Sequence, residues 1–228
     1  MAGRIRCFPP DTPSSACQNQ EYNQSWELLN GGKKMIKISS GYSFEESRSL
    51  NQSLTFESTA QAFKEKGLDF GSAQQRTLGL ISADGTYTNS ALLLSDQCPH
   101  SIKAAYFQGT DKTIFRDRRE FSGSLLKQLE ESLRYLDLFN KTRSTFPGIY
   151  RVDQRDYHPL ILREAVLNAL IHRDYSRFSS TLISIFDDRM EIVNYGGLVE
   201  GMTYADLLNR ISLPRNRRLA NIFFRLGL

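Results

Sequence analysis

Residues 160–171 read Leu-Ile-Leu-Arg-Glu-Ala-Val-Leu-Asn-Ala-Leu-Ile, and as a helix they are apolar on almost every side. Such a helix must be buried on several sides, so the rest of the chain has to supply a core around it. One polar stripe interrupts it, because Glu164, Asn168 and His172 follow each other at the spacing that keeps side chains on one helix face. A buried polar group without partners costs about 2–7 kcal/mol. We therefore expect the stripe to face a polar cavity, a network of partners or a ligand.

The residues that follow this helix predict a β-hairpin. Pro159 suits the first turn of the helix, where its missing N–H does no harm. Further along, residues 181–186 and 189–194 are rich in β-branched and apolar side chains, and Asp187–Asp188 between them favour a turn. The second strand runs into Gly196–Gly197, where glycines allow the backbone to approach a ligand closely.

Glu164 and Asn168 have the chemistry of a magnesium–nucleotide site. The carboxamide oxygen of Asn168 can bind a magnesium ion that also contacts phosphates, because magnesium usually takes few protein ligands and keeps waters. Glu164, one turn earlier on the same face, can orient or deprotonate an attacking water. Two alternatives stay open. A Glu-x-x-x-Asn pair also arises by chance, and His172 can simply cap the helix end by binding free carbonyls.

The helix and the hairpin resemble a known bacterial family, the RecG-related ATP-binding regulators, also described as Schlafen/Alba-type transcriptional regulators. The similar segments are residues 163–175, 186–192, 196–198 and 214–216, together with 108–112, 117–121 and 125–126 in the region that precedes the ATPase-like module. The similarity extends from about Trp26 to the C-terminus.

This resemblance implies an α/β sandwich similar to the GHKL ATPases (the Bergerat fold). In that superfamily an Asn on the equivalent helix holds magnesium, and in its hydrolytic members a Glu four residues earlier is the general base. The adenine-binding box Asp-x-Gly-x-Gly has its best counterpart at residues 194–197, with a neutral Asn in place of Asp and the glycines adjacent. The resemblance thus assigns Glu164 as catalytic base, Asn168 as magnesium ligand, and nucleotide contacts to Asn168, His172, Asn194, Gly196 and Gly197. A further glycine-rich box is expected after residues 216–226, so we expect the module to be incomplete at its C-terminus.

Arginines near the end of the chain are candidates for phosphate contacts. The net charge is +4, with a pI of about 9.0, which permits nucleic-acid binding without requiring it. The guanidinium fork suits phosphates of a nucleotide or of DNA, and the candidates are Arg215, Arg217 and Arg218. Alternatively, they form the solvated face of a helix that carries Leu219 and Phe223 on its other side. The chain contains no Gly-x-x-x-x-Gly-Lys-[Ser/Thr] motif, so we exclude a helicase motor.

The composition is that of an ordinary cytoplasmic protein. Hydrophobic residues make up 40% of the chain, which suffices for a real core, and no apolar run approaches the ~18–20 residues that span a bilayer. Cys7, Cys17 and Cys98 form no Cys-x-x-Cys pair, which favours reduced thiols. Cys98-Pro99-His100 alone is a weak case for a metal site.

We predict an α+β protein in three parts. Residues 1–24 form a disordered tail, 25–145 a mixed α/β region, and 146–228 an incomplete GHKL-like sandwich. Within the middle region we expect helices at 58–66, 72–80 and 120–140, and a strand at 102–107. The predicted function is an ATP-binding regulatory module of a bacterial transcriptional regulator, at most a slow ATPase, with ATP and Mg2+ as ligands, DNA contact through a parent protein, and a homo-oligomer as a hypothesis. The alternative is a non-catalytic DNA-binding or protein-interaction fragment with a vestigial nucleotide fold.

Overall fold

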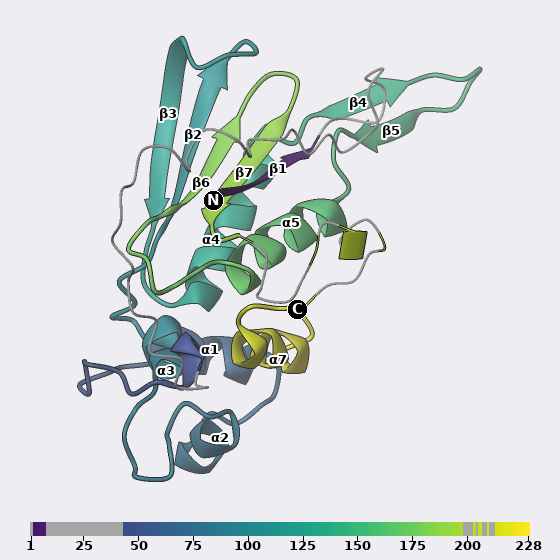
Figure 1. Ribbon diagram of the computed structural model, residues 1–228. Helices are drawn as coiled ribbons and strands as arrows, with labels where there is room; N and C mark the ends of the chain where they lie inside the picture. The colour runs from purple at the N-terminus through teal and green to yellow at the C-terminus, as the bar shows by residue number, and fades with distance from the viewer. Residues whose placement is uncertain (1, 8–42, 198–202, 204, 207–208, 210–212) are drawn as a thin grey trace, which may run out of the picture.

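The computed structural model describes residues 2–7, 43–197, 203, 205–206, 209 and 213–228 (Figure 1). Its centre is a five-stranded mixed sheet in the order β1-β7-β6-β2-β3. The strands are β1 (Ala2–Cys7), β2 (Ile102–Gln108), β3 (Ile114–Phe121), β6 (Thr181–Ile185) and β7 (Met190–Tyr195). Strands β2 and β6 run parallel, and the other neighbours are antiparallel. The predicted α+β class is confirmed, and the sheet-and-helix arrangement fits a GHKL-like fold.

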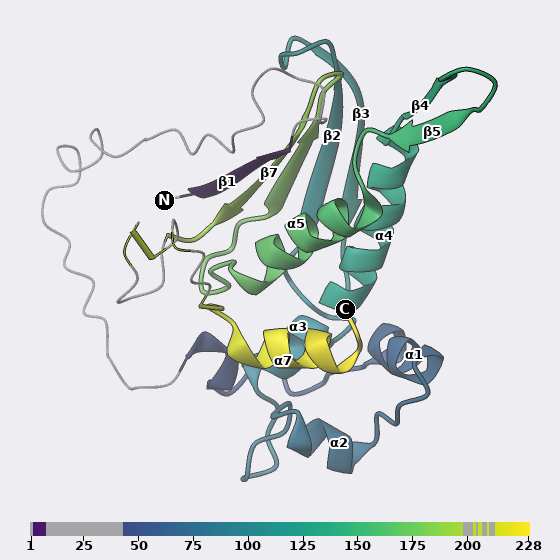
Figure 2. The same cartoon turned by 90° about the vertical axis from the view of Figure 1, so that its right-hand side faces the viewer.

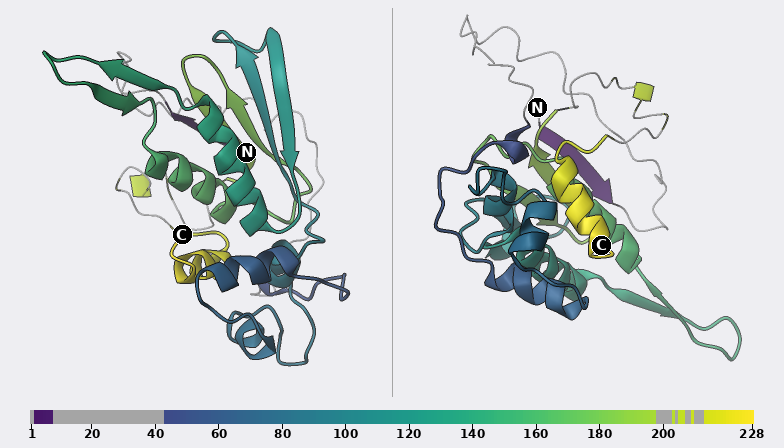
Figure 3. Two further views of the ribbon diagram at one scale, coloured as in Figure 1. Left: turned by 180° about the vertical axis from the view of Figure 1, so that it is seen from behind. Right: turned by 90° about the horizontal axis from the view of Figure 1, so that it is seen from below.

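Two helices cover one face of the sheet. Helix α4 (Leu125–Phe139) packs against β2 and β3, and helix α5 (Pro159–Ile171) packs against β7 and against α4 (Figure 2). The view from behind shows both helices lying across the same side of the sheet (Figure 3). Contact between α4 and α5 thus joins the middle of the chain to its C-terminal part.

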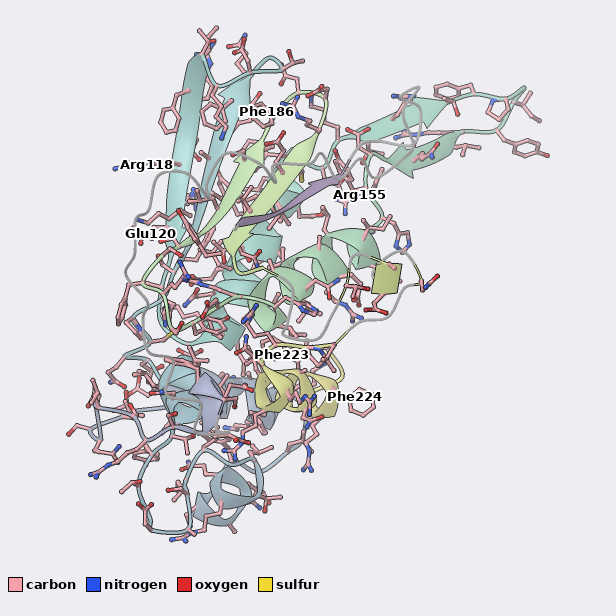
Figure 4. All side chains as sticks on the ribbon, in the orientation of Figure 1. Arg118, Glu120, Arg155, Phe186, Phe223 and Phe224 are labelled. Atoms are coloured by element: carbon pink, nitrogen blue, oxygen red, sulfur yellow. The ribbon has the colours of Figure 1, made fainter. Side chains whose placement is uncertain are left out.

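A second group of helices lies at one end of this layer. It contains η1 (Phe44–Glu46), α1 (Glu57–Glu65), α2 (Ser72–Thr77), α3 (Asn89–Leu94) and α7 (Arg217–Arg225) (Figure 1). Helix α7 is amphipathic: Phe223 is 1% exposed and faces the protein, whereas the next residue, Phe224, is 81% exposed and points outward (Figure 4). Burial of the apolar face of α7 attaches the C-terminal segment to this helical group and to α5.

Helix α4 begins later than its apolar pattern predicts. The prediction started the helix at residue 120, but Glu120 and Phe121 belong to β3, where they pair with Lys103 and Ile102. The helix starts after Ser124, whose hydroxyl accepts a hydrogen bond from the backbone N–H of Lys127 at 3.3 Å. Pairing with β2 therefore removes the first residues from the helix, a long-range effect that local periodicity does not contain.

The hairpin predicted at 181–194 is confirmed as β6 and β7. The turn forms at Asp187–Asp188, and the N–H of Phe186 donates to the carbonyl of Arg189 at 2.8 Å. A second hairpin was not predicted: β4 (Thr142–Thr145) and β5 (Val152–Arg155) form a separate two-stranded arm that projects from the body (Figure 1). Residues 146–151 connect the two strands at the tip of this arm.

Two observations bear on the predicted division of the chain into three parts. Ala2–Cys7 forms the edge strand β1, although the sequence predicts a disordered tail there, and residues 8–24 lie outside the described residues. Strand β2 from the middle region pairs with β6 from the C-terminal region, so a boundary at 145/146 does not separate two sheets. In the part of the chain that the structure describes, no helix is both long and apolar enough to cross a membrane.

Candidate functional site

Helix α5 holds the predicted catalytic and magnesium-binding residues. Pro159 occupies its first turn as expected, and the Nδ1 atom of His158 accepts a hydrogen bond from the N–H of Leu160 at 3.3 Å. Side chains around most of the helix are buried, namely Leu162, Ala165, Val166, Leu167, Ala169 and Leu170. The helix therefore owes its stability to tertiary packing of these residues.

One side of α5 is exposed, and Glu164 and Asn168 lie on it. The side chain of Glu164 is 58% exposed, and its one hydrogen-bond partner among the described residues is the neighbouring Arg163 guanidinium at 3.3 Å. Asn168 is also exposed, and its carboxamide bonds to no residue that the structure describes. Two apolar side chains share this side, since Leu160 and Ile161 are 54% and 52% exposed. The helix is thus buried on fewer sides than its sequence predicts.

Exposure removes one energetic reason to expect a ligand at these two residues. Solvated side chains do not carry the cost of burying polar groups without partners. The structure also removes one expected alternative, an internal network of hydrogen bonds around Glu164 and Asn168. These two side chains therefore make no hydrogen-bond network within the described part of the fold. The polar cavity expected from the sequence stays a prediction.

His172 lies at the C-terminal end of α5. It is the C-cap residue, but the cap is made by its backbone N–H, which donates to the carbonyl of Asn168 at 3.0 Å. Its ring is half-buried, and burial together with the nearby Arg215 charge lowers its pKa below 6.5. The ring is therefore neutral at neutral pH and offers a hydrogen-bond donor and an acceptor in place of a cation.

The end of β7 packs against this helix end. The carboxamide nitrogen of Asn194 donates to the carbonyl of Ala169 at 2.7 Å, which leaves its oxygen as the group that can accept from an adenine amino group. Gly196 has a φ of +143°, and a Cβ there would lie 3.1 Å from the carbonyl oxygen of His172. A side chain at Gly197 would meet open space. The first glycine is thus needed for close packing, and the second is not.

Arg215 joins the same group of residues. Its Nη2 donates to the carbonyl of Gly197 at 2.9 Å, and its charge acts on both His172 and Asp174. Burial raises the pKa of Asp174, but hydrogen bonds from Ser176 and the Arg215 charge outweigh it, so this pKa lies below its usual value. The structure therefore brings together His172, Gly196, Gly197 and Arg215, residues that are far apart in the sequence.

The other two candidate arginines differ from each other. Arg217 is exposed at the start of α7. Arg218 is used within the fold, because its Nη1 donates to the carbonyl of Gly79 at 2.8 Å and its Nη2 pairs with Glu46 at 3.2 Å. Its guanidinium therefore connects α7 to the segments that contain Gly79 and Glu46. The alternative of a solvated helix face does not predict these contacts.

Sequence reasoning missed two buried residues beside this site, and the first is Arg173. Its side chain is 1% exposed and donates to the carbonyls of Ser101 (3.2 Å) and Ser179, while its Nη2 lies 3.3 Å from Nδ1 of His100. It also lies over the ring of Tyr175, 5.1 Å from its centroid. The sequence around Arg173 is polar, and no pattern in it indicates that this side chain is buried.

The second missed residue is Asn216, which precedes α7. It is 3% exposed, and its carboxamide nitrogen donates to the carbonyls of Ile171 and Arg173, each at 2.8 Å. In the sequence, Asn216 stood out only because residues 214–216 resemble a segment of the family. That resemblance does not say what the Asn216 side chain does. In the structure Asn216 holds the loop that follows α5.

The structure places no metal-binding cluster at these residues. Among the described residues, no group of three or more His, Cys, Asp or Glu side chains gathers as a metal site. Burial raises the pKa of Cys98 to about 11, and the thiol donates to the carbonyl of His100 at 3.8 Å, which gives the Cys98–His100 pair a structural role. A magnesium ion bound through Asn168, phosphates and waters needs no such cluster.

Comparisons with known proteins bear on the C-terminal part of the chain. Residues 179–228 match the family model described as "Putative ATP-dependent DNA helicase recG C-terminal". That range includes Asn194, Gly196, Gly197 and Arg215 but begins after α5. A search of curated proteins found no match.

Among solved structures, the crystal structure of the DIP2311 protein from Corynebacterium diphtheriae superposes with a TM-score of 0.70 at 22% sequence identity. The likeness covers 83% of this chain and 40% of that protein, so the chain spans about two fifths of its length. At this identity the likeness concerns the fold. The C-terminal segment of this chain, from residue 179, is thus similar to the ATPase-like module of the RecG C-terminal family.

Proposed function

We propose that this chain contains a regulatory Mg-ATP-binding module whose nucleotide lies along the exposed side of α5 and the end of β7. Asn168 binds magnesium through its carboxamide oxygen, and Glu164 orients the water in a hydrolysis that is slow at most. Asn194 and the Gly196–Gly197 turn contact the base or the sugar.

The observation that carries this proposal is the state of the two polar side chains on α5. Asn168 is exposed, and within the described residues its carboxamide forms no hydrogen bond and the Glu164 carboxylate bonds only to its neighbour Arg163. Both therefore retain the ligand groups that a magnesium–phosphate complex needs. The match of residues 179–228 to a model named for an ATP-dependent protein supports the choice of nucleotide.

The surroundings have complementary chemistry. Exposed Leu160 and Ile161 supply apolar surface at the start of α5, on the same side as Glu164 and Asn168. At the other end of the helix, Arg215 brings positive charge to the Gly197 carbonyl and to half-buried His172. Exposed apolar surface and a guanidinium on or beside one helix suit a ligand that has both apolar and anionic groups.

Calorimetry of ATP with and without magnesium tests the proposal. Wild type should bind Mg-ATP. Asn168→Ala should weaken the affinity for ATP in the presence of magnesium by at least about tenfold, because it removes a direct metal ligand. Asn221→Ala is the matched control, since Asn221 is an exposed asparagine on α7 away from the site. Equal affinity in the wild type and Asn168→Ala, or no heat at millimolar nucleotide, would reject the assignment.

The hydrolytic role of Glu164 needs its own variant. Glu164→Gln keeps the size and the hydrogen-bonding ability of the side chain but cannot take a proton. We expect it to bind Mg-ATP as wild type does and to lose whatever phosphate release the wild type shows. Retained phosphate release in this variant would remove Glu164 as the base.

DNA contact through the arginines has less support. Arg215 and Arg218 donate to backbone carbonyls inside the fold, so of the three candidates Arg217 is the one left exposed. Duplex binding that weakens steeply with salt would restore this alternative, and no binding at ~50 mM salt would eliminate it. A role in a cytoplasmic bacterial transcriptional regulator, with DNA contact through other parts of a longer protein and assembly as a homo-oligomer, belongs to the same proposal.

A further inference from the structure

We propose that α7 transmits the state of the nucleotide site to the helical group at the end of the sheet, with Glu45 and Asn216 as its two positioning residues. The inference rests on the proposed function, because it concerns the regulation of that same site. It assigns a role to contacts that join residues far apart in the sequence and that neither the family match nor the predicted site explains.

Glu45 holds one side of this connection. Its side chain belongs to η1, is 1% exposed, and accepts hydrogen bonds from the backbone N–H groups of Arg218 (3.0 Å) and Leu219 (2.8 Å). These are free donors at the N-terminus of α7, where a negative charge is also favoured by the helix dipole. The carbonyl of Glu45 in turn accepts from the hydroxyl of Ser90 on α3 at 3.1 Å. The carboxylate therefore attaches the start of α7 to the η1–α3 unit.

Asn216 holds the other side. It occupies the N-cap position of α7, yet its side chain does not cap that helix. The carboxamide instead donates to the carbonyls of Ile171 and Arg173, and its backbone N–H also donates to Ile171 at 3.1 Å. Capping of α7 by Glu45 is what leaves the Asn216 side chain available for this second task.

The loop that Asn216 holds is continuous with the proposed site. It follows directly on the last turn of α5, in which the N–H of His172 donates to the carbonyl of Asn168 at 3.0 Å. The next contact runs to β7, where the N–H of Asp174 donates to the carbonyl of Tyr195 at 2.8 Å. A ligand that changes the position of Asn168 or of the Gly196 turn therefore acts on the carbonyls that Asn216 binds.

The chain of contacts thus runs from the α5 loop through Asn216 to the start of α7, and from there through Glu45 to η1 and α3. The buried apolar face of α7 makes the helix a single packed element, so a shift at Asn216 displaces the amides that Glu45 holds. Coupling between two sites is reciprocal. Nucleotide should alter the Glu45 contacts, and loss of those contacts should alter nucleotide affinity.

Amide hydrogen exchange on the wild-type full chain tests the first direction without any substitution. Saturating Mg-ATP should slow exchange at Arg218 and Leu219, whose amides Glu45 binds, while amides in the middle of α4 keep their rates. Unchanged rates at Arg218 and Leu219 in a protein that binds Mg-ATP by calorimetry would overturn the coupling and leave the proposed function standing. Absence of Mg-ATP binding in the wild type would overturn both.

A pair of adjacent variants tests the reverse direction. Glu45→Gln places an amide donor against the α7 donors, so we expect faster exchange at residues 171–174 and Mg-ATP affinity weaker by about fivefold or more. Glu46→Gln is the matched control, because Glu46 contacts the Arg218 side chain and not the α7 amides. A merely structural effect of Glu45→Gln would accelerate exchange throughout α4 as well. Uniform acceleration, or wild-type affinity in Glu45→Gln, would refute the positioning role.

Discussion

Acidification should destabilise this protein through His100, and the size of the effect follows from its surroundings. The ring is 3% exposed, and the Arg173 guanidinium lies 3.3 Å from its Nδ1. Because Arg173 donates, Nδ1 must accept, and the neutral ring carries its proton on Nε2. Burial and the Arg173 charge both disfavour a second proton and lower the pKa of His100 from 6.5 to about 4.

The sign follows from where the proton is bound. The unfolded chain takes up the proton near its ordinary pKa of 6.5, whereas the folded protein takes it up only near 4. The stability that depends on a neutral His100 is therefore complete above pH 6.5 and is lost progressively as the pH falls toward 4. At 1.36 kcal/mol per pKa unit, the loss is about 3 kcal/mol in full, and about 2–3 kcal/mol at pH 4.5. This is a large part of the ~5–15 kcal/mol by which a typical domain is stable.

Urea denaturation at several values between pH 7 and pH 4.5 measures the effect. His100→Gln keeps an acceptor for Arg173 but does not titrate, so its free energy of unfolding should fall less than that of wild type over this range. The matched control is His158→Asn, which changes an exposed histidine and retains a good N-cap for α5. Parallel profiles for wild type and His100→Gln would refute the account of a buried neutral ring.

Two further pairs of variants test packing at positions that the structure distinguishes. Gly196→Ala should destabilise by about 1–3 kcal/mol in thermal denaturation, because of its φ of +143° and the His172 oxygen 3.1 Å from the added Cβ, whereas Gly197→Ala should be nearly neutral. Equal effects of these two changes would contradict the tight packing. Leu136→Ala, at 0% exposure, should cost about 2–5 kcal/mol and Leu138→Ala, at 73%, within about 0.5 kcal/mol. A costly change at Leu138 would indicate a partner on that surface.

The predictions that succeeded concern elements with a strong local pattern. Residues 160–171 are a helix and 181–194 a hairpin in the structure as in the sequence, because helical and strand periodicities differ and a turn at Asp187–Asp188 separates the strands. The helix predicted at 58–66 agrees within a residue with α1, and the helix expected to carry Leu219 and Phe223 is α7. In each case the residues that decide the element are its own neighbours in the chain.

The predictions that failed depend on partners far away in sequence. Residues 114–121 carry many charges and no clear alternation, and pairing with β2 makes them a strand. The β4–β5 arm likewise depends on cross-strand pairing between residues such as Thr142 and Arg155 that no short pattern indicates. The exposed side of α5 depends on which other elements pack against the helix. The apolar pattern of the helix alone predicts more buried positions than the structure has.

The candidate site divides in the same way. The sequence by itself determined the helical spacing of Glu164 and Asn168, the hairpin that precedes the Gly196–Gly197 turn, and the absence of a helicase motor motif, because these are properties of consecutive residues. Only the tertiary structure decided that the two polar side chains are exposed, that Arg215 lies at the Gly197 carbonyl, and that Glu45 caps a helix whose N-cap Asn216 binds the α5 loop. Burial and hydrogen bonding at these positions depend on groups that approach through space.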